Sequence, residues 1–303
     1  MSNLENSPEI RDIINKTILQ YPSIEKVIRK DQKFYELNFC RYNQLKCLKM
    51  KNPAAYNEML EEIAEFTLAG VIYGSYLDSN GFFDLTIQGH TIPRKPFTPL
   101  LSNLDKWLTQ YSAEYRRKSF GKKLKSEFFN HYSEIQFYDK LFVKGFRPVV
   151  PAPIGSNGKN LDFKIIMDSH EIFIELTTQF NAYETEVNLT VDDRKDAITK
   201  IKEIIAEKTC KQFQFVESDD ICIILAVNIE YADMDLPLDF PENPLKYCPY
   251  FVYGLLLYRR GQGKFYINPR YSLTSDEIHF FENLFDELSP VERLLRAVAQ
   301  STR

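Results

Sequence analysis

The sequence predicts an α/β fold: a mixed β-sheet core flanked by helices, preceded by an α-helical N-terminal domain. Apolar residues before about residue 116 recur mainly at helical spacing, whereas short β-branched runs alternate with helical segments after it. The chain has 303 residues, 44% of them hydrophobic and 26% charged, which is a globular composition with length for two domains. We expect a helical domain over residues 1–115, a core over 116–270 and a helical tail over 271–303.

Four helices and a loop are expected in the N-terminal domain. Isoleucines at helical spacing predict a first helix, and Pro22 marks the start of a second. Residues 54–69 and 100–115 predict two more helices. Residues 70–99 are rich in Gly, Asn, Asp and Pro, so we expect a loop there with a short hairpin.

In the core, a helix over residues 126–144 is expected to end at Gly145. Apolar runs at 161–167 and 172–178 predict a β-hairpin turned at 168–171. A helix over 192–215, a buried strand over 221–229 and a second hairpin over 251–258 and 264–267 follow. The tail predicts a helix over 275–300, broken at Pro290.

The first hairpin gathers polar side chains on one face. With a turn at 168–171, Lys164 would lie opposite Glu175, and Asp162 opposite Thr177. Because side chains alternate between the faces of a strand, these four residues share one face. The other face carries the apolar residues Phe163, Ile165, Met167, Ile174 and Leu176. Two carboxylates on adjacent strands form a hard oxygen site of the kind Mg²⁺ prefers. A divalent ion there could activate water and neutralise charge on a phosphodiester.

The hairpin resembles the PD-(D/E)xK superfamily, the restriction-endonuclease-like nucleases. The resemblance covers roughly residues 120–230 and rests on Glu134 in a helix, then Gly145, Asp162 and the run 174–177. It implies that Asp162 and Glu175 hold Mg²⁺ or Mn²⁺, with Glu134 as an outer-shell or second-metal ligand. Thr177 stands where the family has its lysine. Lys164 is the best-placed substitute, and Lys195 and Lys200 are further candidates.

A basic cluster directly precedes the helix that carries Glu134. It contributes +6 to a net charge of -4 and consists of Arg116, Arg117, Lys118, Lys122, Lys123 and Lys125. Clustered Lys and Arg supply the non-specific part of nucleic-acid binding, so the near-neutral total does not exclude a DNA partner. A solvated helix end is the alternative interpretation of the same run.

The remaining patterns exclude several classes. The five cysteines are odd in number and form no CxxC pair, which argues against a disulfide scaffold and a structural zinc site. The N-terminus has no apolar signal run, and no stretch is long enough to span a membrane, so we expect a cytoplasmic protein with no membrane partner. Phosphate-loop and nucleophile-elbow motifs are absent.

The sequence thus favours a Mg²⁺-dependent endonuclease that hydrolyses DNA, or a descendant of one that has lost activity. The alternative is a catalytically inactive nucleic-acid-binding or complex-forming protein on the same fold, which Thr177 favours. A purely structural subunit is a third interpretation. The helical N-terminal domain is expected to contact DNA, a protein partner or a second copy of the chain.

Overall fold

The computed structural model describes residues 8–28, 68–81, 84–87, 90–93, 96–111, 128–149, 161–180, 221–231, 243–247, 252–259 and 261–285, together with residues 124, 199, 203, 206, 238 and 240. The chain forms two compact units. The first comprises Met1–Asp139, Phe180–Val187 and Tyr231–Met234, and the second comprises Lys140–Gln179, Asn188–Glu230 and Asp235–Arg303. The three-part division expected from the sequence stays a prediction.

Among the residues that the structure describes, the first unit is mainly helical. It contains α1 (Pro8–Ile18), α2 (Pro22–Ile28), α5 (Leu68–Ser79), α6 (Thr98–Gln110) and the beginning of α8 (Phe128–Val143). A two-stranded hairpin, β1 (Asp84–Ile87) with β2 (His90–Pro93), lies between α5 and α6 in the sequence and confirms the predicted short hairpin. Aromatic rings join α6 to α8, with Trp107 and Tyr132 centred 5.3 Å apart.

The expected loop over residues 70–99 is wrong in its first third, because α5 runs through Gly70 and Gly74 to Ser79. The helix is buried along most of its length, including Leu68, Val71 and Ile72. A helix that is apolar on all sides lacks the amphipathic stripe by which surface helices are recognised. Burial of this apolar surface offsets the helix cost of two glycines, which is about 1 kcal/mol each. The expected helix over 54–69 lies mostly outside the described residues.

Helix α8 ends where the sequence predicts. Gly145 has φ +93°, a left-handed conformation that glycine adopts without steric cost. The amide of Phe146 donates to the carbonyl of Leu141 over 3.0 Å, and the amide of Gly145 donates to that of Phe142 over 3.0 Å. This pair of bonds satisfies carbonyls that the helix end would otherwise leave open.

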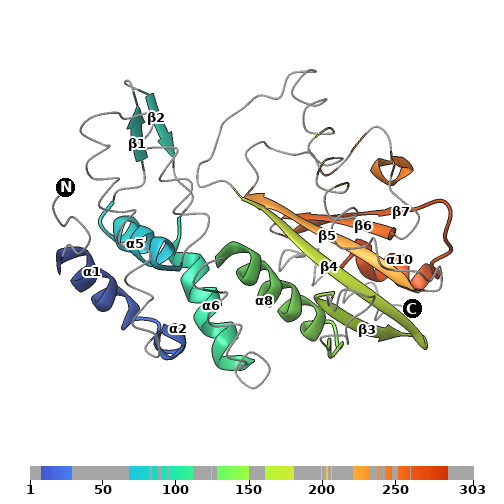
Figure 1. The fold of residues 1–303 in the computed structure, drawn as a ribbon, viewed down its shortest axis with the longest axis horizontal. Coiled ribbons are helices and arrows are strands. Elements are labelled where there is room, and N and C mark those ends of the chain that lie inside the picture. Colours follow the sequence, from blue (N-terminus) through green and yellow to red (C-terminus); the bar gives the residue numbers. More distant parts are fainter. Residues whose placement is uncertain are drawn as a thin grey trace, which may run out of the picture. The chain divides into compact units, whose positions relative to one another are not determined.

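The second unit is built on a five-stranded mixed sheet. The strands are β3 (Phe163–Met167), β4 (His170–Phe180), β5 (Cys222–Tyr231), β6 (Val252–Arg259) and β7 (Gln262–Ile267), and their order in the sheet is β3-β4-β5-β6-β7. β3 with β4 and β6 with β7 are antiparallel, whereas β5 and β6 are parallel. The α/β class and the mixed sheet are therefore confirmed, and Figure 1 shows the strands side by side. A 3₁₀ turn (Pro244–Tyr247) precedes β6.

The first hairpin has a tighter turn than the sequence predicts. Only Asp168 and Ser169 form it, with φ values of +46° and +72°, and Met167 lies opposite His170 instead of Ile172. Two successive left-handed residues are the backbone of the favoured two-residue hairpin turn. The pairing is therefore shifted by two residues from the expected one. A shift of two leaves every side chain on its expected face, because side chains alternate with a period of two.

Helix α10 (Ser275–Glu282) packs against β7, which is consistent with the aromatic stack of Phe281 on Phe265, 5.0 Å apart. It ends at Glu282, before the break expected at Pro290, because Asn283 caps it and Leu284 and Phe285 leave the helix to become buried. The ring of Phe285 stacks on that of Tyr258, with centroids 4.0 Å apart. Residues 286–303, with Pro290, lie outside the described part.

The expected helix over residues 192–215 is described at three positions only, residues 199, 203 and 206, and all three are helical. Among the helices that the structure describes, none combines the length and the apolar character needed to cross a bilayer.

Candidate metal-binding hairpin

Asp162 and Glu175 are brought together by the observed hairpin register. Phe163 pairs with Ile174, so the next position along each strand sets Asp162 beside Glu175. One carboxylate oxygen of Asp162, Oδ2, accepts a hydrogen bond from the backbone amide of Leu176 over 2.7 Å. This bond orients the Asp162 side chain across the hairpin at the position of the second acid. The expected partner of Asp162 was Thr177, so the observed register places the two acids closer than the sequence predicts.

The burial of the two acids differs. Glu175 lies among apolar neighbours on β4 and is only 3% exposed. Asp162 is half-buried. A buried carboxylate is retained in folded proteins only with hydrogen bonds, an ion pair or a metal, because an isolated ionised group is costly to desolvate. The buried position of Glu175 therefore distinguishes it from an ordinary charge on an exposed hairpin face.

Lys164 does not lie opposite Glu175, which corrects the expected pairing. It lies opposite Phe173, and its Nζ bonds Oε1 of Glu171 over 2.8 Å. Its backbone pairs on the outer side with Val149, through hydrogen bonds of 3.0 Å and 2.7 Å. The ammonium that the sequence assigned to the two acids is thus bound to a third carboxylate, which the sequence analysis did not single out.

The donor set suits a hard divalent cation. Two carboxylates are an accepted protein contribution to a Mg²⁺ site, since this ion keeps several of its waters. Within the described residues, no group of three or more His, Cys, Asp or Glu side chains could hold a metal ion. A metal bound by Asp162 and Glu175 would therefore complete its coordination with water and carbonyl oxygens.

Glu134 belongs to the first unit, whereas the Asp162–Glu175 pair belongs to the second. Its Oε2 lies 2.7 Å from Nδ1 of His131, one helical turn away on α8. Both side chains are largely buried, at 20% and 10% exposure. Residues three positions apart in a helix lie on the same face, which places His131 beside Glu134. The role of Glu134 as a metal ligand stays a prediction.

Several predicted functional residues lie outside the described part of the chain. These are the whole basic cluster and the two further lysine candidates: Arg116, Arg117, Lys118, Lys122, Lys123, Lys125, Lys195 and Lys200. Their contact with a phosphate backbone or with the acids stays a prediction.

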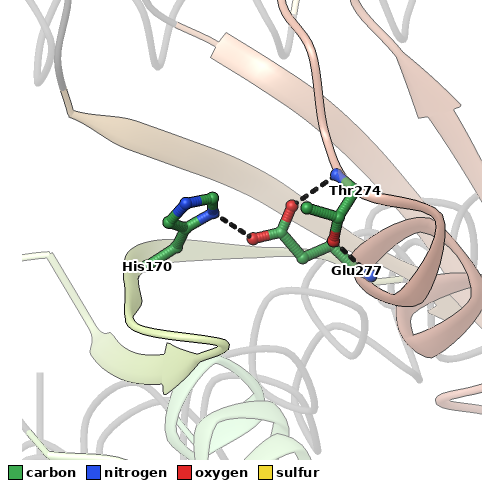
Figure 2. Close-up of polar contacts among 3 residues, drawn as sticks. All are labelled: His170, Thr274 and Glu277. Carbon is green, nitrogen blue, oxygen red and sulfur yellow. Dashed lines mark hydrogen bonds and ion pairs between the residues drawn. The ribbon is translucent and has the colours of Figure 1, made fainter.

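A second polar cluster, in the same unit, was missed by sequence reasoning. The carboxylate of Glu277 on α10 accepts from the amide of Thr274 over 2.7 Å and lies 3.1 Å from Nδ1 of His170, the first residue of β4 (Figure 2). The amide of Glu277 in turn donates to the hydroxyl of Thr274 over 3.2 Å. The Thr-x-x-Glu spacing is the signature of a capping box, and it lies at the helix start that the sequence predicted at residue 275. The contact with His170 spans 107 residues and had no local signal.

No protein-family model matches the sequence, and no curated protein matches it. Among solved structures, the crystal structure of an XisH family protein from Nostoc punctiforme is similar to this chain, at 18% sequence identity. The match covers 41% of this chain and 88% of that one, with a TM-score of 0.21.

Proposed function

We propose that this protein is a metal-dependent nuclease of restriction-endonuclease-like fold that hydrolyses phosphodiester bonds in DNA. The observation that supports the proposal is the cross-strand neighbourhood of Asp162 and buried Glu175 on a hairpin of a mixed sheet. The resemblance to the PD-(D/E)xK superfamily rests on the same two residues. The five-stranded mixed sheet of the second unit agrees with it at the level of fold class.

Each residue has a distinct role in the proposal. Asp162 and Glu175 hold Mg²⁺ or Mn²⁺, and the bond from the Leu176 amide keeps the Asp162 carboxylate oriented. The bound ion supplies an activated water and neutralises charge on the phosphodiester. Lys164 replaces the motif lysine and stabilises the developing negative charge. The basic cluster over 116–125 binds the phosphate backbone.

The test is a plasmid-nicking assay of the full chain with Mg²⁺ or Mn²⁺. Asp162→Asn is the sharpest variant, because the amide oxygen still accepts the Leu176 hydrogen bond while the negative charge is lost. We expect Asp162→Asn and Glu175→Gln to reduce nicking by more than about 100-fold, since direct ligands matter more than the groups that orient them. Asp276→Asn, an exposed carboxylate on α10, is the matched control. Nicking that survives both variants would overturn the assignment.

The second candidate is a catalytically inactive nucleic-acid-binding or complex-forming protein on the same fold. Two observations favour it: Thr177 occupies the position of the family's lysine, and Lys164 is bonded to Glu171. Calorimetric titration with Mn²⁺ separates the two candidates. Absence of divalent binding, together with DNA affinity that falls steeply with salt, selects the inactive protein.

A further inference from the structure

Lys164 lies between two carboxylates on one face of the hairpin. Because it is opposite Phe173, its diagonal neighbours on β4 are Glu171 and Glu175, two positions before and two positions after. Diagonal neighbours in an antiparallel pair are about 7–8 Å apart, a distance that a long side chain can span. One lysine side chain is therefore within reach of either acid, but its single ammonium adopts one arrangement at a time.

The observed arrangement is the bond to Glu171. Nζ of Lys164 is 2.8 Å from Oε1 of Glu171, and the two side chains are 26% and 53% exposed. Glu175, by contrast, is 3% exposed. The Lys164 ammonium loses its hydrating water if it turns toward buried Glu175, whereas it keeps much of that water when it bonds exposed Glu171. The cost of desolvation therefore favours the bond to Glu171.

We propose that Glu171 is the resting-state partner of Lys164 and restrains the proposed nuclease site. The inference rests on the proposed function. In the resting state the ammonium is held near the turn of the hairpin, away from the Asp162–Glu175 pair. A phosphate group that arrives at the acids competes with Glu171 for the ammonium and draws Lys164 across Phe173. Exposed ion pairs are weak, so the restraint corresponds to about a two- to fivefold effect on rate.

The test compares Glu171→Gln with the unchanged full chain in the nicking assay. We expect the variant to cleave about two- to fivefold faster at low ionic strength and the advantage to shrink as salt screens the pair. When both chains also carry Lys164→Met, Glu171→Gln should no longer increase the cleavage rate, because the gain acts only through the ammonium. Glu282→Gln, an exposed change on α10, is the matched control and should leave the rate unchanged. An equal or slower rate for Glu171→Gln in an active protein overturns the inference.

A second readout does not depend on cleavage. Acetylation of the Lys164 amine by an amine-reactive ester, followed by peptide mass spectrometry, should be about two- to fivefold faster in Glu171→Gln than in the unchanged chain. Unchanged labelling overturns the resting contact whatever the nicking result. Faster labelling with no nicking by any variant overturns the proposed function, and with it the regulatory role. The two failures are thus distinguishable.

Discussion

Nδ1 of His170 lies 3.1 Å from Oε1 of Glu277, so the first residue of β4 is bonded to helix α10 across 107 residues of sequence (Figure 2). Glu277 is 1% exposed, and its second oxygen accepts the amide of Thr274 over 2.7 Å. A buried carboxylate is costly unless its oxygens are bonded. One oxygen of Glu277 accepts the helix-capping bond, and the other contacts His170 at the turn of the first hairpin. A single side chain therefore connects α10 with β4 in the second unit.

Glu277→Ala is expected to lower the free energy of unfolding by about 1–3 kcal/mol, because the variant loses the capping box and the contact with His170. His170→Ala should cost less, about 1 kcal/mol or below, because its side chain is 61% exposed. Urea unfolding monitored by circular dichroism measures both. Asp276→Ala, exposed in the same helical turn, should change stability by no more than about 0.5 kcal/mol. Equal losses in Glu277→Ala and Asp276→Ala would contradict the assigned role.

The thiol of Cys222 is expected to be unreactive in the folded protein. Burial raises the pKa of Cys222 from 9.0 to about 12, and the nearby Glu277 carboxylate adds to the rise. Because only the thiolate attacks alkylating reagents, iodoacetamide at pH 8 should modify Cys222 in urea but not in buffer, as read by peptide mass spectrometry. Rapid modification of the folded chain would contradict this.

The same pKa shift predicts a pH dependence of stability. The pKa of Cys222 is higher in the folded chain than in the unfolded one, so its contribution to stability is fully present below pH 9 and is lost as the pH rises toward 12. Urea unfolding at pH 8 and pH 10 should therefore show a smaller loss of stability in Cys222→Ala than in the unchanged chain. An identical loss in both proteins would indicate that Cys222 does not titrate differently on unfolding.

Gly254 on β6 is expected not to tolerate a side chain. A methyl group there would meet the ring of Phe265 from the neighbouring strand at a distance that real side-chain contacts essentially never show. Gly254→Ala should destabilise the chain by about 1–3 kcal/mol through overpacking. Gly263→Ala is the control, because its nearest neighbours would be 3.4–3.8 Å away, and thermal unfolding should show little change. Combination with Phe265→Leu should restore part of the loss in Gly254→Ala.

Asp78, at the end of α5, supplies the cap for the start of α6. Its Oδ2 accepts the amides of Phe97, over 2.6 Å, and Thr98, over 3.1 Å, at the start of α6, whose own N-cap residue makes no side-chain cap bond. Asp78→Ala should cost about 1–3 kcal/mol, because buried amides lose their acceptor. Asp78→Asn keeps an acceptor but loses the charge near the helix N-terminus, so its loss should be smaller.

Asp12→Asn is the matched control for Asp78→Asn. Asp12 is an exposed residue of α1 that forms an ion pair with Lys16, one helical turn away. Such a pair contributes about 0.2–0.5 kcal/mol, so the control should lie near the unchanged chain in urea unfolding. A comparable loss in the two Asp→Asn variants would show that the Asp78 contacts do not stabilise α6.

Local signals predicted the elements that carry them strongly. Gly145 predicted the end of α8, and β-branched runs predicted β3, β4 and β5. Helix α5 was missed because Gly70 and Gly74 suggest a loop, and only its burial against neighbouring helices makes a helix favourable. Helix α10 was predicted too long, because the buried positions of Leu284 and Phe285 draw the chain out of the helix and no local pattern announces this.

The candidate site, like the fold, was predicted from the sequence in part only. The sequence by itself determined which side chains share a face of the first hairpin, because the alternation of apolar and polar residues has a period of two. Tertiary structure alone decided which of them are neighbours. Two registers that differ by two residues present the same faces, so the pattern cannot distinguish them. The left-handed turn at Asp168 and Ser169 distinguishes them, and so Asp162 lies beside Glu175 while Lys164 bonds Glu171.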